Sequence, residues 1–466
     1  MLEGLEVSEV PYSEVVKMSK DFRINSEFFS KQFMQLKDGG KLAFLPLKQL
    51  AKIADGDHSK FPDNQLAEVR YLQARDITNN FLEITSDVFV SKEYFSKNKR
   101  SIITEETILL SIMGTVGDIA ITPKNFQACM CNRALAIIRD IKTISPQFLF
   151  AFLITNQAAN LIERLKNGGV QQRINLDVLG ELEIPNFGNE LQDKVTQLVL
   201  LAQETRQQTK QKYAQAEQTL LEAVGLANCK PSTQNTNIKT FAQSFGASGR
   251  LDAEYYQPKY EDYLKLIFDY KDGWARLSEV CELKDTNFNP IDDVSYQYIE
   301  LSDIDKSGGI TGCTNDIGAN LPSRARRFVN AGDVVVSSIE GSLSSCALVS
   351  KDYDSALCST GFYVIKSQAI NAETLLVLMK SELMQNLLKQ SCSGTILTAL
   401  NKDEFSNLPI PKIDVTTQTK ISQLVQQSFS LKAQSEHLLS VAKRAVEMAI
   451  EQDEAAAMHF IENSTN

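Results

Sequence analysis

Hydrophobic and polar positions repeat with a helical period over two unusually long stretches of the chain. The first, residues 189–225, contains no proline and no internal glycine and is built mostly from Gln, Leu, Ala, Glu and Lys, which favour helix. At about 1.5 Å per residue this helix would span roughly 55 Å, far more than the usual helix of about 12 residues. Its apolar seam has coiled-coil spacing on either side of a polar stretch around Thr205 and Thr209, and comprises Leu191, Val195, Leu198, Ala202, Tyr213, Ala216, Leu220 and Ala223.

The second stretch, residues 415–451, lies at an offset of 226 from the first. Two long helices that each end one half of a chain can pair only if the intervening half returns, so we predict an antiparallel coiled coil with a globular domain at either end. Two unrelated amphipathic core helices are the alternative, and the matching spacing of the two stretches disfavours it. The second seam comprises Ile421, Leu424, Ser428, Leu431, Ser435, Leu438, Ala442, Ala445 and Ala449.

The remaining sequence is also duplicated. RINSEFF, from Arg23, matches RLDAEYY, from Arg250, in identity or chemical type at every position. One offset held over some 200 residues is difficult to obtain by chance, so each copy is a globular part of about 165 residues followed by a long helix. The further matches are Tyr71 with Tyr298, Ser111–Gly114 with Ser338–Gly341 and Cys131 with Cys358 at an offset of 227, and Asn175 with Asn401 and Ile184-Pro185 with Ile410-Pro411 at 226.

Each globular part mixes short alternating runs, which predict strands, with longer helical stretches. The predicted fold class is therefore α+β: two tandem globular α/β domains separated by long helices that form an antiparallel coiled coil, with an internal pseudo-twofold duplication. The linker is rich in Ser, Thr, Asn and Gln, as exposed connections are. The predicted segments are a leader at 1–21, a globular domain at 22–188, a spacer helix at 189–226, a linker at 227–248, a globular domain at 249–413, a spacer helix at 414–452 and a tail at 453–466.

Composition narrows the class of protein. Of 466 residues, 43% are apolar and 23% charged, which are ordinary globular values. No run of 18 apolar residues occurs and the start of the chain is acidic and mixed, so we expect a soluble, cytoplasmic protein. Eight scattered cysteines and three isolated histidines give poor zinc spacing, and we expect free buried thiols and no metal.

Catalytic signatures are missing from the sequence. It contains no phosphate-binding G-x-x-x-x-G-K-[ST] loop, no H-E-x-x-H, and no glycine-rich loop between a strand and a helix of the kind that binds a dinucleotide or a methyl donor. Three isolated histidines also leave little for a Ser-His-Asp or Cys-His arrangement. We therefore expect the chain alone to catalyse nothing and to bind no cofactor.

Two short basic strings are the informative polar feature. The net charge of −10 argues at first against nucleic acid, but residues 22–188 carry 20 basic and 18 acidic side chains, against 16 and 23 in residues 249–413. Any DNA contact must then use local patches, and partner subunits could cover the acidic remainder. A solvated turn of charge is the alternative. The strings, aligned at an offset of 227, consist of Lys97, Lys99 and Arg100 in the first copy and Arg324, Arg326 and Arg327 in the second.

Loops near these strings could also contribute. Gln171, Gln172 and Arg173 lie in a polar string that could reach into a DNA groove, or could cap a helix. The loops at Gly114–Gly117 and Gly341–Ser344 follow a predicted strand in each copy. We interpret them as tight turns that need positive φ in preference to phosphate cradles.

The chain resembles the specificity (S) subunits of type I restriction-modification systems over residues 20–451. The resemblance rests on two copies of the same series of features: a basic string, a strand, a G-x-x-G turn, a helix, a stretch ending in Ile-Pro and a long helix. The resemblance implies that each globular part is a target recognition domain that reads half of a bipartite DNA site, and that the long helices form the spacer. It implies two adenine-N6 DNA methyltransferase (M) subunits and restriction (R) motor-nuclease subunits as partners, which would use S-adenosylmethionine, ATP and Mg²⁺.

The sequence departs from the family pattern in two places. A Gly-Asp turn before the central strand is present as Gly332-Asp333 but is replaced by Glu105-Glu106 in the first copy, and the second G-x-x-G ends in Ser344. Two other kinds of function stay open at this point. They are the recognition half of a split methyltransferase-nuclease, and a non-enzymatic coiled-coil tether or DNA-mimicking inhibitor.

Overall fold

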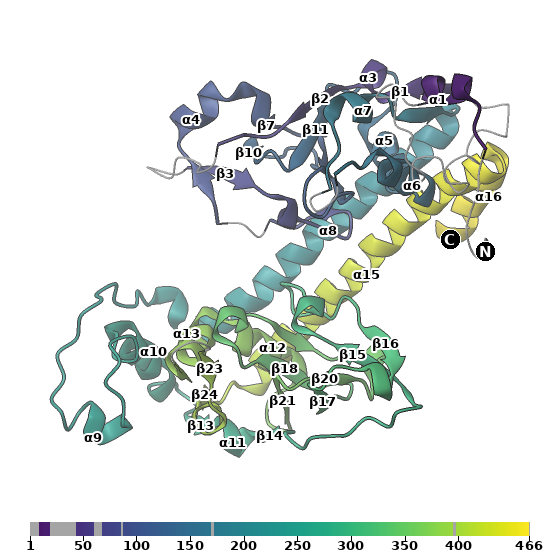
Figure 1. Ribbon diagram of the computed structural model, residues 1–466. Coiled ribbons are helices and arrows are strands. Elements are labelled where there is room, and N and C mark those ends of the chain that lie inside the picture. Colours follow the sequence, from purple (N-terminus) through teal and green to yellow (C-terminus); the bar gives the residue numbers. More distant parts are fainter. Residues whose placement is uncertain are drawn as a thin grey trace. The chain divides into compact units, whose positions relative to one another are not determined.

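The computed structural model describes residues 9–18, 43–59, 68–84, 87–168, 172–394 and 398–465. The chain divides into two compact units, one formed by residues 1–205 and 434–466 and the other by residues 206–433. Each of the long helices labelled α8 (Asn189–Ala223) and α15 (Val415–Glu451) in Figure 1 contributes one half to each unit. The repeated string at residues 23–29 and the candidate residue Gln171 lie outside the described residues.

Unit 1 contains two four-stranded sheets, in the orders β2-β11-β8-β9 and β6-β3-β10-β7, and two-stranded ribbons β1-β12 and β4-β5. Its strands are β1 (Ala43–Pro46), β2 (Lys52–Asp55), β3 (Val69–Leu72), β4 (Ile77–Thr78), β5 (Phe81–Leu82), β6 (Phe89–Val90), β7 (Ile102–Ile103), β8 (Ile108–Ser111), β9 (Ile119–Ile121), β10 (Cys129–Cys131), β11 (Leu135–Arg139) and β12 (Glu183–Asn186). Its helices are α1 (Tyr12–Met18), α3 (Leu47–Leu50), α4 (Lys92–Lys97), α5 (Pro146–Leu153), α6 (Asn156–Leu165), α7 (Leu176–Gly180), the first half of α8 (Asn189–Ala223), the second half of α15 (Val415–Glu451) and α16 (Glu454–Thr465).

Unit 2 has the corresponding sheets, β14-β21-β18-β19 and β16-β15-β20-β17, with ribbons β13-β24 and β22-β23. Its strands are β13 (Trp274–Arg276), β14 (Cys281–Leu283), β15 (Ser295–Ile299), β16 (Thr314–Ile317), β17 (Ala325–Phe328), β18 (Val334–Ser337), β19 (Cys346–Leu348), β20 (Leu357–Ser359), β21 (Phe362–Ser367), β22 (Cys392–Ser393), β23 (Ala399–Leu400) and β24 (Pro409–Pro411). Besides the other halves of α8 and α15, its helices are α9 (Phe245–Ser248), α10 (Pro258–Phe268), α11 (Leu277–Val280), α12 (Ala372–Lys380), α13 (Glu382–Gln390) and α14 (Lys402–Ser406).

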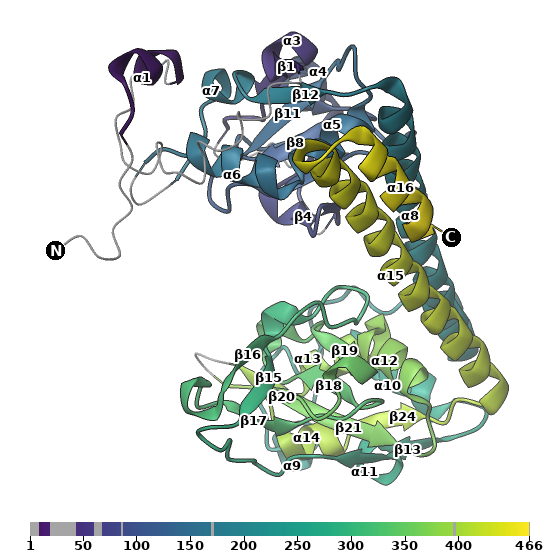
Figure 2. The same ribbon diagram turned by 90° about the vertical axis from the view of Figure 1, so that its right-hand side faces the viewer.

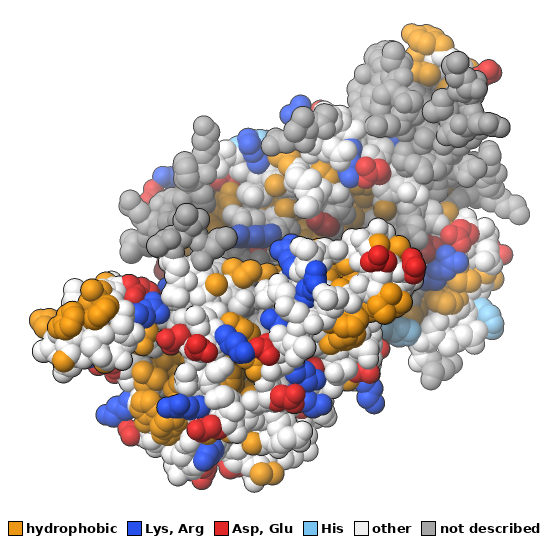
Figure 3. Space-filling view, turned by 60° about the horizontal axis from the view of Figure 1, so that its bottom comes forward, with side chains coloured by type: hydrophobic (Ala, Val, Ile, Leu, Met, Phe, Trp, Pro, Cys, Tyr) orange, Lys and Arg blue, Asp and Glu red, His pale blue; other side chains and the backbone are white. Residues whose placement is uncertain are grey.

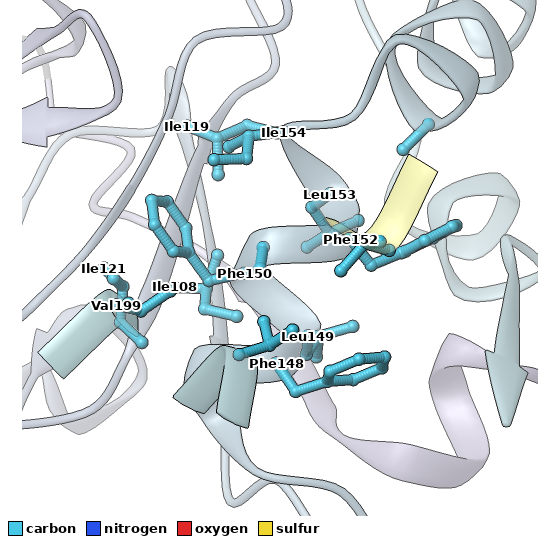
Figure 4. Close-up of a cluster of buried hydrophobic side chains, with 14 of the residues drawn as sticks. Ile108, Ile119, Ile121, Phe148, Leu149, Phe150, Phe152, Leu153, Ile154 and Val199 are labelled. Carbon is cyan, nitrogen blue, oxygen red and sulfur yellow. The ribbon is translucent and has the colours of Figure 1, made fainter. Parts of the chain in front are cut away.

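Helix α5 forms the centre of the core of unit 1. Pro146 occupies its first turn, where a missing N–H costs nothing, and the N-cap Ser145 accepts a hydrogen bond from the Phe148 N–H at 3.0 Å. All its residues from Gln147 to Leu153 are buried, as expected for a helix that is apolar on every side. Its side chains gather with those of β8, β9 and α8 (Figure 4), so the sheet is held to the long helix through α5.

The two units share strand order and register, which confirms the predicted α+β fold class. In the mixed sheet of each unit, one pair of strands is parallel: Tyr71 of β3 lies opposite Met130 of β10, and Tyr298 of β15 lies opposite Leu357 of β20. Both members of the second pair correspond to those of the first at the predicted offset of 227. The two copies therefore share an architecture as well as a sequence pattern.

The central strands, however, correspond with an offset of 226. In unit 1, Ser111 pairs with Leu135. The residue of unit 2 that corresponds to Leu135 is Phe362, and Phe362 pairs with Ser337. Consistently, the Ile112 N–H donates to Ala134 O and the Ser338 N–H to Gly361 O. The predicted match of Ser111 with Ser338 is thus wrong by one residue.

The turn before the central strand shows the same shift. The Glu106 N–H donates to Thr122 O, and the Gly332 N–H donates to Val349 O, which corresponds to Thr122 at an offset of 227. Glu106, with φ +51°, therefore stands in the place of Gly332, with φ +88°. The predicted replacement of Gly332-Asp333 by Glu105-Glu106 is wrong by one residue, because the turn in the first copy is Glu106-Thr107.

The long helices pack together within each unit, and both views show them side by side (Figures 1 and 2). In unit 1, Val195 and Ala202 of α8 belong to the same buried cluster as Leu438 and Ala442 of α15. In unit 2, residues from the end of α8 join Ile421 and Val425, from the beginning of α15. The start of each helix thus meets the end of the other, which is an antiparallel arrangement. At the polar middle, Ser428 Oγ donates to Thr209 O at 3.0 Å.

Two smaller expectations concern cysteines and membranes. All eight cysteines are free and six are buried, and burial raises the pKa of Cys281 and Cys346 to about 11. Free thiols are thus confirmed, whereas Cys229 and Cys313 are half-buried. Across the described ranges, no helix combines the length and the apolar character that crossing a membrane requires.

Candidate nucleic-acid interface

The first basic string begins at the end of a short helix and continues through a turn. Ser91 caps α4 by accepting from the Tyr94 N–H at 3.2 Å, and Asn98 ends the helix before a 3₁₀ turn at Lys99–Ser101. Lys97 is 70% exposed and pairs with Glu93 at 2.6 Å, one turn away on the same helix. This pairing raises the pKa of Lys97. An exposed pair of this kind contributes little stability, and Lys97 stays available to another anion.

Arg100 is placed differently from the two lysines. Its side chain is 65% exposed, but its Nη2 forms an ion pair with Asp55, which ends β2 and is only 14% exposed. His58 Nε2 lies 2.7 Å from the other carboxylate oxygen of Asp55. Lys99 is exposed and forms no ion pair with any described residue. Arg100 is therefore paired with a carboxylate, whereas its neighbour Lys99 has no such partner among the residues that the structure describes.

A buried carboxylate lies behind this pair. Asp57 is 7% exposed and accepts hydrogen bonds from Tyr94 OH at 2.8 Å, Tyr71 OH at 3.3 Å and Ser59 Oγ at 3.3 Å. Burial, and then the charge of Asp57, raise the pKa of Tyr71 far above its usual value. Because Tyr94 belongs to α4, Asp57 ties the helix that carries Lys97 to the segment that carries Asp55.

The second basic string lies on an edge strand and not in a helix. Arg324 is 63% exposed, with Nη2 at 3.9 Å from Glu300 Oε1. Arg326 donates from Nε to Ser323 O at 2.9 Å and from Nη1 to Asn289 Oδ1. Residue 326 coincides with an irregularity in the pairing of β17 with β20. The string thus presents two guanidinium groups, one of them fixed by neutral acceptors.

Arg327 faces inward. Its Nε and Nη1 are buried and have no hydrogen-bond partner among the described residues. Its charge helps to lower the pKa of Asp285, although the hydrogen bond from Lys402 is the larger cause. A half-buried guanidinium with unsatisfied donors is costly, so Arg327 differs from the exposed cations with which its sequence position grouped it.

The two strings are not equivalent residue by residue. Ile102 pairs with Met130 and Phe328 with Leu357, so β7 and β17 correspond at an offset of 226 and not 227. Arg327 then corresponds to the buried Ser101, whereas Arg326 stands at the irregularity in the pairing of β17 and is not matched to Arg100 by register. The predicted alignment of the strings, with three cations at identical spacing, is wrong for this reason. That these six residues contact DNA stays a prediction.

The third candidate group comes together with the loop after the central strand. The backbone of Arg173 exchanges two hydrogen bonds with that of Asn167, each 2.9 Å, and pairs with Met113. Ala399 makes the same bridge to Ile339 in unit 2. The side chains of Gln172 and Arg173 are exposed. Backbone pairing therefore fixes this loop beside Gly114, and its DNA contacts also stay a prediction.

The glycine loops differ between the copies. Gly114 and Gly117 have φ of +81° and +112°, as predicted for tight turns. In the second copy, Glu340–Ser342 form a 3₁₀ turn, and Gly341 is not among the glycines with positive φ. Because Met113 corresponds to Ile339, Gly114 corresponds to Glu340 and Gly117 to Leu343. The predicted match of this loop with Gly341–Ser344 is therefore wrong by one residue, and neither glycine of the first loop is kept in the second.

Surface charge is mixed in this protein. On the face drawn in Figure 3, Lys and Arg side chains alternate with Asp and Glu and do not gather into one large basic patch. Among the described residues, no group of three or more His, Cys, Asp or Glu side chains is arranged to hold a metal ion.

The sequence did not indicate the residues that contact the two arginines. Asp55 and Asn289 lie far from the basic strings along the chain. The one available signal was the Asp-Gly-Asp run after a strand, which contains Asp55.

One segment of the chain matches a known protein-family model. Residues 41–186 match the family model for the type I restriction modification DNA specificity domain. This segment, about a third of the chain, is therefore similar to the specificity domain of type I restriction-modification systems. The resemblance predicted from the sequence is thereby confirmed. The matched segment holds Asp55, the first basic string and Arg173, so the candidate interface of unit 1 lies within the specificity domain.

Solved structures resemble the chain at low sequence identity. The type I restriction-modification system S subunit from M. genitalium is 13% identical, with 90% of this chain and 97% of that chain covered and a TM-score of 0.42. The HsdS subunit from Thermoanaerobacter tengcongensis is 14% identical, covering 89% and 98%, with a TM-score of 0.30. A structure titled for complex assembly and conformational transition of the type I R-M system is 15% identical, covering 88% and 98%, at 0.30. The comparison with curated proteins gives no match.

Proposed function

We propose that this chain is the non-catalytic specificity subunit of a type I restriction-modification enzyme, and that each of its two copies reads one half of a bipartite DNA target. The observation that carries the proposal is the match of residues 41–186 to a DNA specificity domain, combined with the same strand order and register in unit 2. A duplicated reader on one chain suits a target with two halves.

Partners supply the chemistry in this proposal. Two adenine-N6 methyltransferase subunits dock on the chain, restriction subunits with motor and nuclease activity join them, and the complex works in the cytoplasm with S-adenosylmethionine, ATP and Mg²⁺ on the partners. The sequence lacks a methyl-donor motif and a phosphate-binding loop, which supports this division of labour. A DNA-mimicking inhibitor is disfavoured because such a protein would present carboxylates, whereas both strings present cations, among them Lys97 and Arg324.

DNA binding would use the described cations in two ways. Exposed side chains such as Lys97, Lys99 and Arg324 suit phosphate contacts, which position a protein on the duplex. Gln172 and Arg173 lie on the loop beside the central strand and suit a groove contact. Helices α8 and α15 would act as the spacer between the two readers. Their antiparallel packing within each unit supports this role.

The proposal is tested with purified components. The chain alone, given S-adenosylmethionine, ATP, Mg²⁺ and DNA, should neither methylate nor cut, and methylation should appear when a methyltransferase subunit is added. The matched control is the methyltransferase subunit without this chain, which should not methylate at a defined motif. Methyl transfer by this chain alone, after contaminating enzymes are excluded, would refute the non-catalytic role.

A further inference from the structure

Two arginines lie at the same distance along the chain from equivalent strand pairs, although the sequence alignment did not pair them. Arg100 lies two residues before Ile102, which pairs with Met130, and Arg326 lies two residues before Phe328, which pairs with Leu357. Met130 and Leu357 are themselves equivalent, because their parallel partners are Tyr71 and Tyr298. The local structure differs, because Arg100 lies in a 3₁₀ turn whereas Arg326 stands at the irregularity in the pairing of β17 with β20.

Each arginine contacts a polar side chain near the first strand of the other sheet, Arg100 through an ion pair and Arg326 through a hydrogen bond. Asp55, the last residue of β2, pairs with Arg100 Nη2, and Asn289, six residues beyond β14, accepts from Arg326 Nη1. Arg326 gives a second hydrogen bond, from Nε to Ser323 O. The two acceptors are not counterparts, because Lys52 and Glu282 lie opposite equivalent residues and Asp55 therefore corresponds to Asp285. What the units share is an arginine near the edge strand that is contacted by a polar side chain from the segment following β2 or β14.

The acceptor in unit 1 is rigid. Asp55 is paired in register with Ala136, and the next residue, Gly56, donates to Leu135 O at 3.1 Å. Addition of a Cβ at Gly56 would bring it to 2.1 Å from Asn132 O, so the backbones lie in close contact there. The 14% exposed carboxylate of Asp55 thus orients a guanidinium that is 65% exposed. Within the described part of the chain, no other segment supports Lys97 or Lys99 in a comparable way.

An oriented guanidinium suits base readout. Arginine has five N–H donors in a rigid fork, and a carboxylate that takes one of them leaves the others directed at a single place. Guanine offers O6 and N7 in the major groove, and arginine is their commonest specific partner. Because Asp55 also compensates the charge of Arg100, this arginine adds less to general attraction for phosphates than an unpaired lysine does.

We propose that Arg100 and Arg326 each read a guanine edge in one half of the target, and that Asp55 and Asn289 are the positioning residues that orient them. This inference rests on the proposed DNA-reading function. The lysines of the first string then position the duplex, and only one cation of that string carries sequence information.

The first test is Arg100→Lys in the full chain assembled with its methyltransferase partner. The charge is kept and the fork is lost, so the slope of log K against log salt should stay the same. Discrimination against replacement of one G·C pair should fall by about 5- to 150-fold, the range for one bidentate base contact, at a single position of one half-site. The control Lys99→Arg should leave discrimination unchanged at every position. Unchanged discrimination in Arg100→Lys would overturn the inference.

Asp55→Asn separates orientation from charge. Loss of a carboxylate near DNA should leave binding of random DNA equal or tighter, while discrimination at the position read by Arg100 falls. The matched control is Glu93→Gln, which removes an exposed carboxylate from the same region and releases Lys97. If both variants change binding alike, Asp55 acts only through its charge and is not a positioning residue. In an Arg100→Lys background, Asp55→Asn should cause no further loss of discrimination.

Unit 2 provides an independent test that survives misfolding of a unit 1 variant. Arg326→Lys should reduce discrimination at one G·C pair of the other half-site, and Asn289→Ala should do so at the same pair. Effects of both variants on the half read by unit 1 would contradict the inference. Failure of the proposed function looks different, since the wild-type complex itself would then show no sequence discrimination.

Discussion

Gly56→Ala tests whether the segment that carries Asp55 is held against its neighbour as tightly as the structure indicates. The new Cβ would lie 2.1 Å from Asn132 O and 2.5 Å from Cys131 O, and both are backbone atoms that cannot rotate away. The two segments would have to separate. Three backbone hydrogen bonds bind them, Gly56 N–H to Leu135 O at 3.1 Å, Asp57 N–H to Cys131 O at 2.8 Å and Arg133 N–H to Asp57 O at 2.9 Å.

The expected cost follows from these contacts. Losing two or three hydrogen bonds at about 1 kcal/mol each, with about 1–3 kcal/mol for overpacking, should lower the free energy of unfolding of unit 1 by about 3–6 kcal/mol. Urea titration with hydrogen exchange should show faster exchange of the β10 and β11 amides. The fluorescence of Trp274, the sole tryptophan and part of unit 2, should give an unchanged transition.

The matched control is Gly341→Ala, because a Cβ there meets no atom within 4 Å and the residue is not among those with positive φ. Its stability should stay within about 0.5 kcal/mol of wild type. If Gly56→Ala retains wild-type protection of β10 and β11, the close contact is wrong, and with it the rigid support of Asp55.

Three further predictions concern charge, pH and the helices. Replacing Lys97, Lys99 and Arg100 by Ala should weaken DNA binding of the assembled complex and reduce the slope of log K against log salt by about one unit per lost phosphate contact. An unchanged slope in binding assays would show that these side chains are solvated and do not contact phosphate. Burial raises the pKa of Asp305, but Lys432 and the surrounding hydrogen bonds outweigh burial and lower it. The stability that Asp305 gives to unit 2 should therefore be fully present above the unfolded pKa of about 3.9. It should be lost as the pH falls through the lower folded pKa. Asp305→Asn should remove this acid dependence in Trp274-monitored unfolding, and persistence of the dependence would exclude the pair as its source. Insertion of one heptad into both α8 and α15 at facing levels adds roughly 10 Å and should widen the gap of the methylated motif by about three base pairs. An unchanged gap in a folded variant would show that the helices do not set the gap.

Long-period features were predictable from the sequence, whereas register was not. The ends of α8 and α15 fall within a few residues of the predicted ones because propensity and the seam agree over more than 30 positions. Strands β8 and β18 are buried at every position, so no alternation of apolar and polar residues marks which residue faces which side. A shift of one residue between the copies therefore passed unnoticed in the alignment of Ser111 and of the basic strings.

The sequence indicated the cations of the candidate site but not the side chains that contact Arg100 and Arg326. Lys97 and Arg324 are exposed, as a solvent-facing string should be. The partners of Arg100 and Arg326 come from segments that are distant along the chain, and such pairs depend on sheet packing that no local pattern encodes. Arg327 is half-buried and its charge acts on Asp285, which is likewise distant along the chain, so composition cannot show either feature.

The central claim, that two separate readers on one chain define a bipartite target, is tested most directly by exchanging one of them and sequencing the methylated genome. Residues 22–188 are replaced by the corresponding domain of a related specificity subunit, and host DNA is compared with that of the parent and of a strain lacking the gene. One half of the methylated motif should change, while the other half and the gap between them stay as they were. A motif whose two halves change together, or methylation that does not depend on this chain at all, would contradict the account.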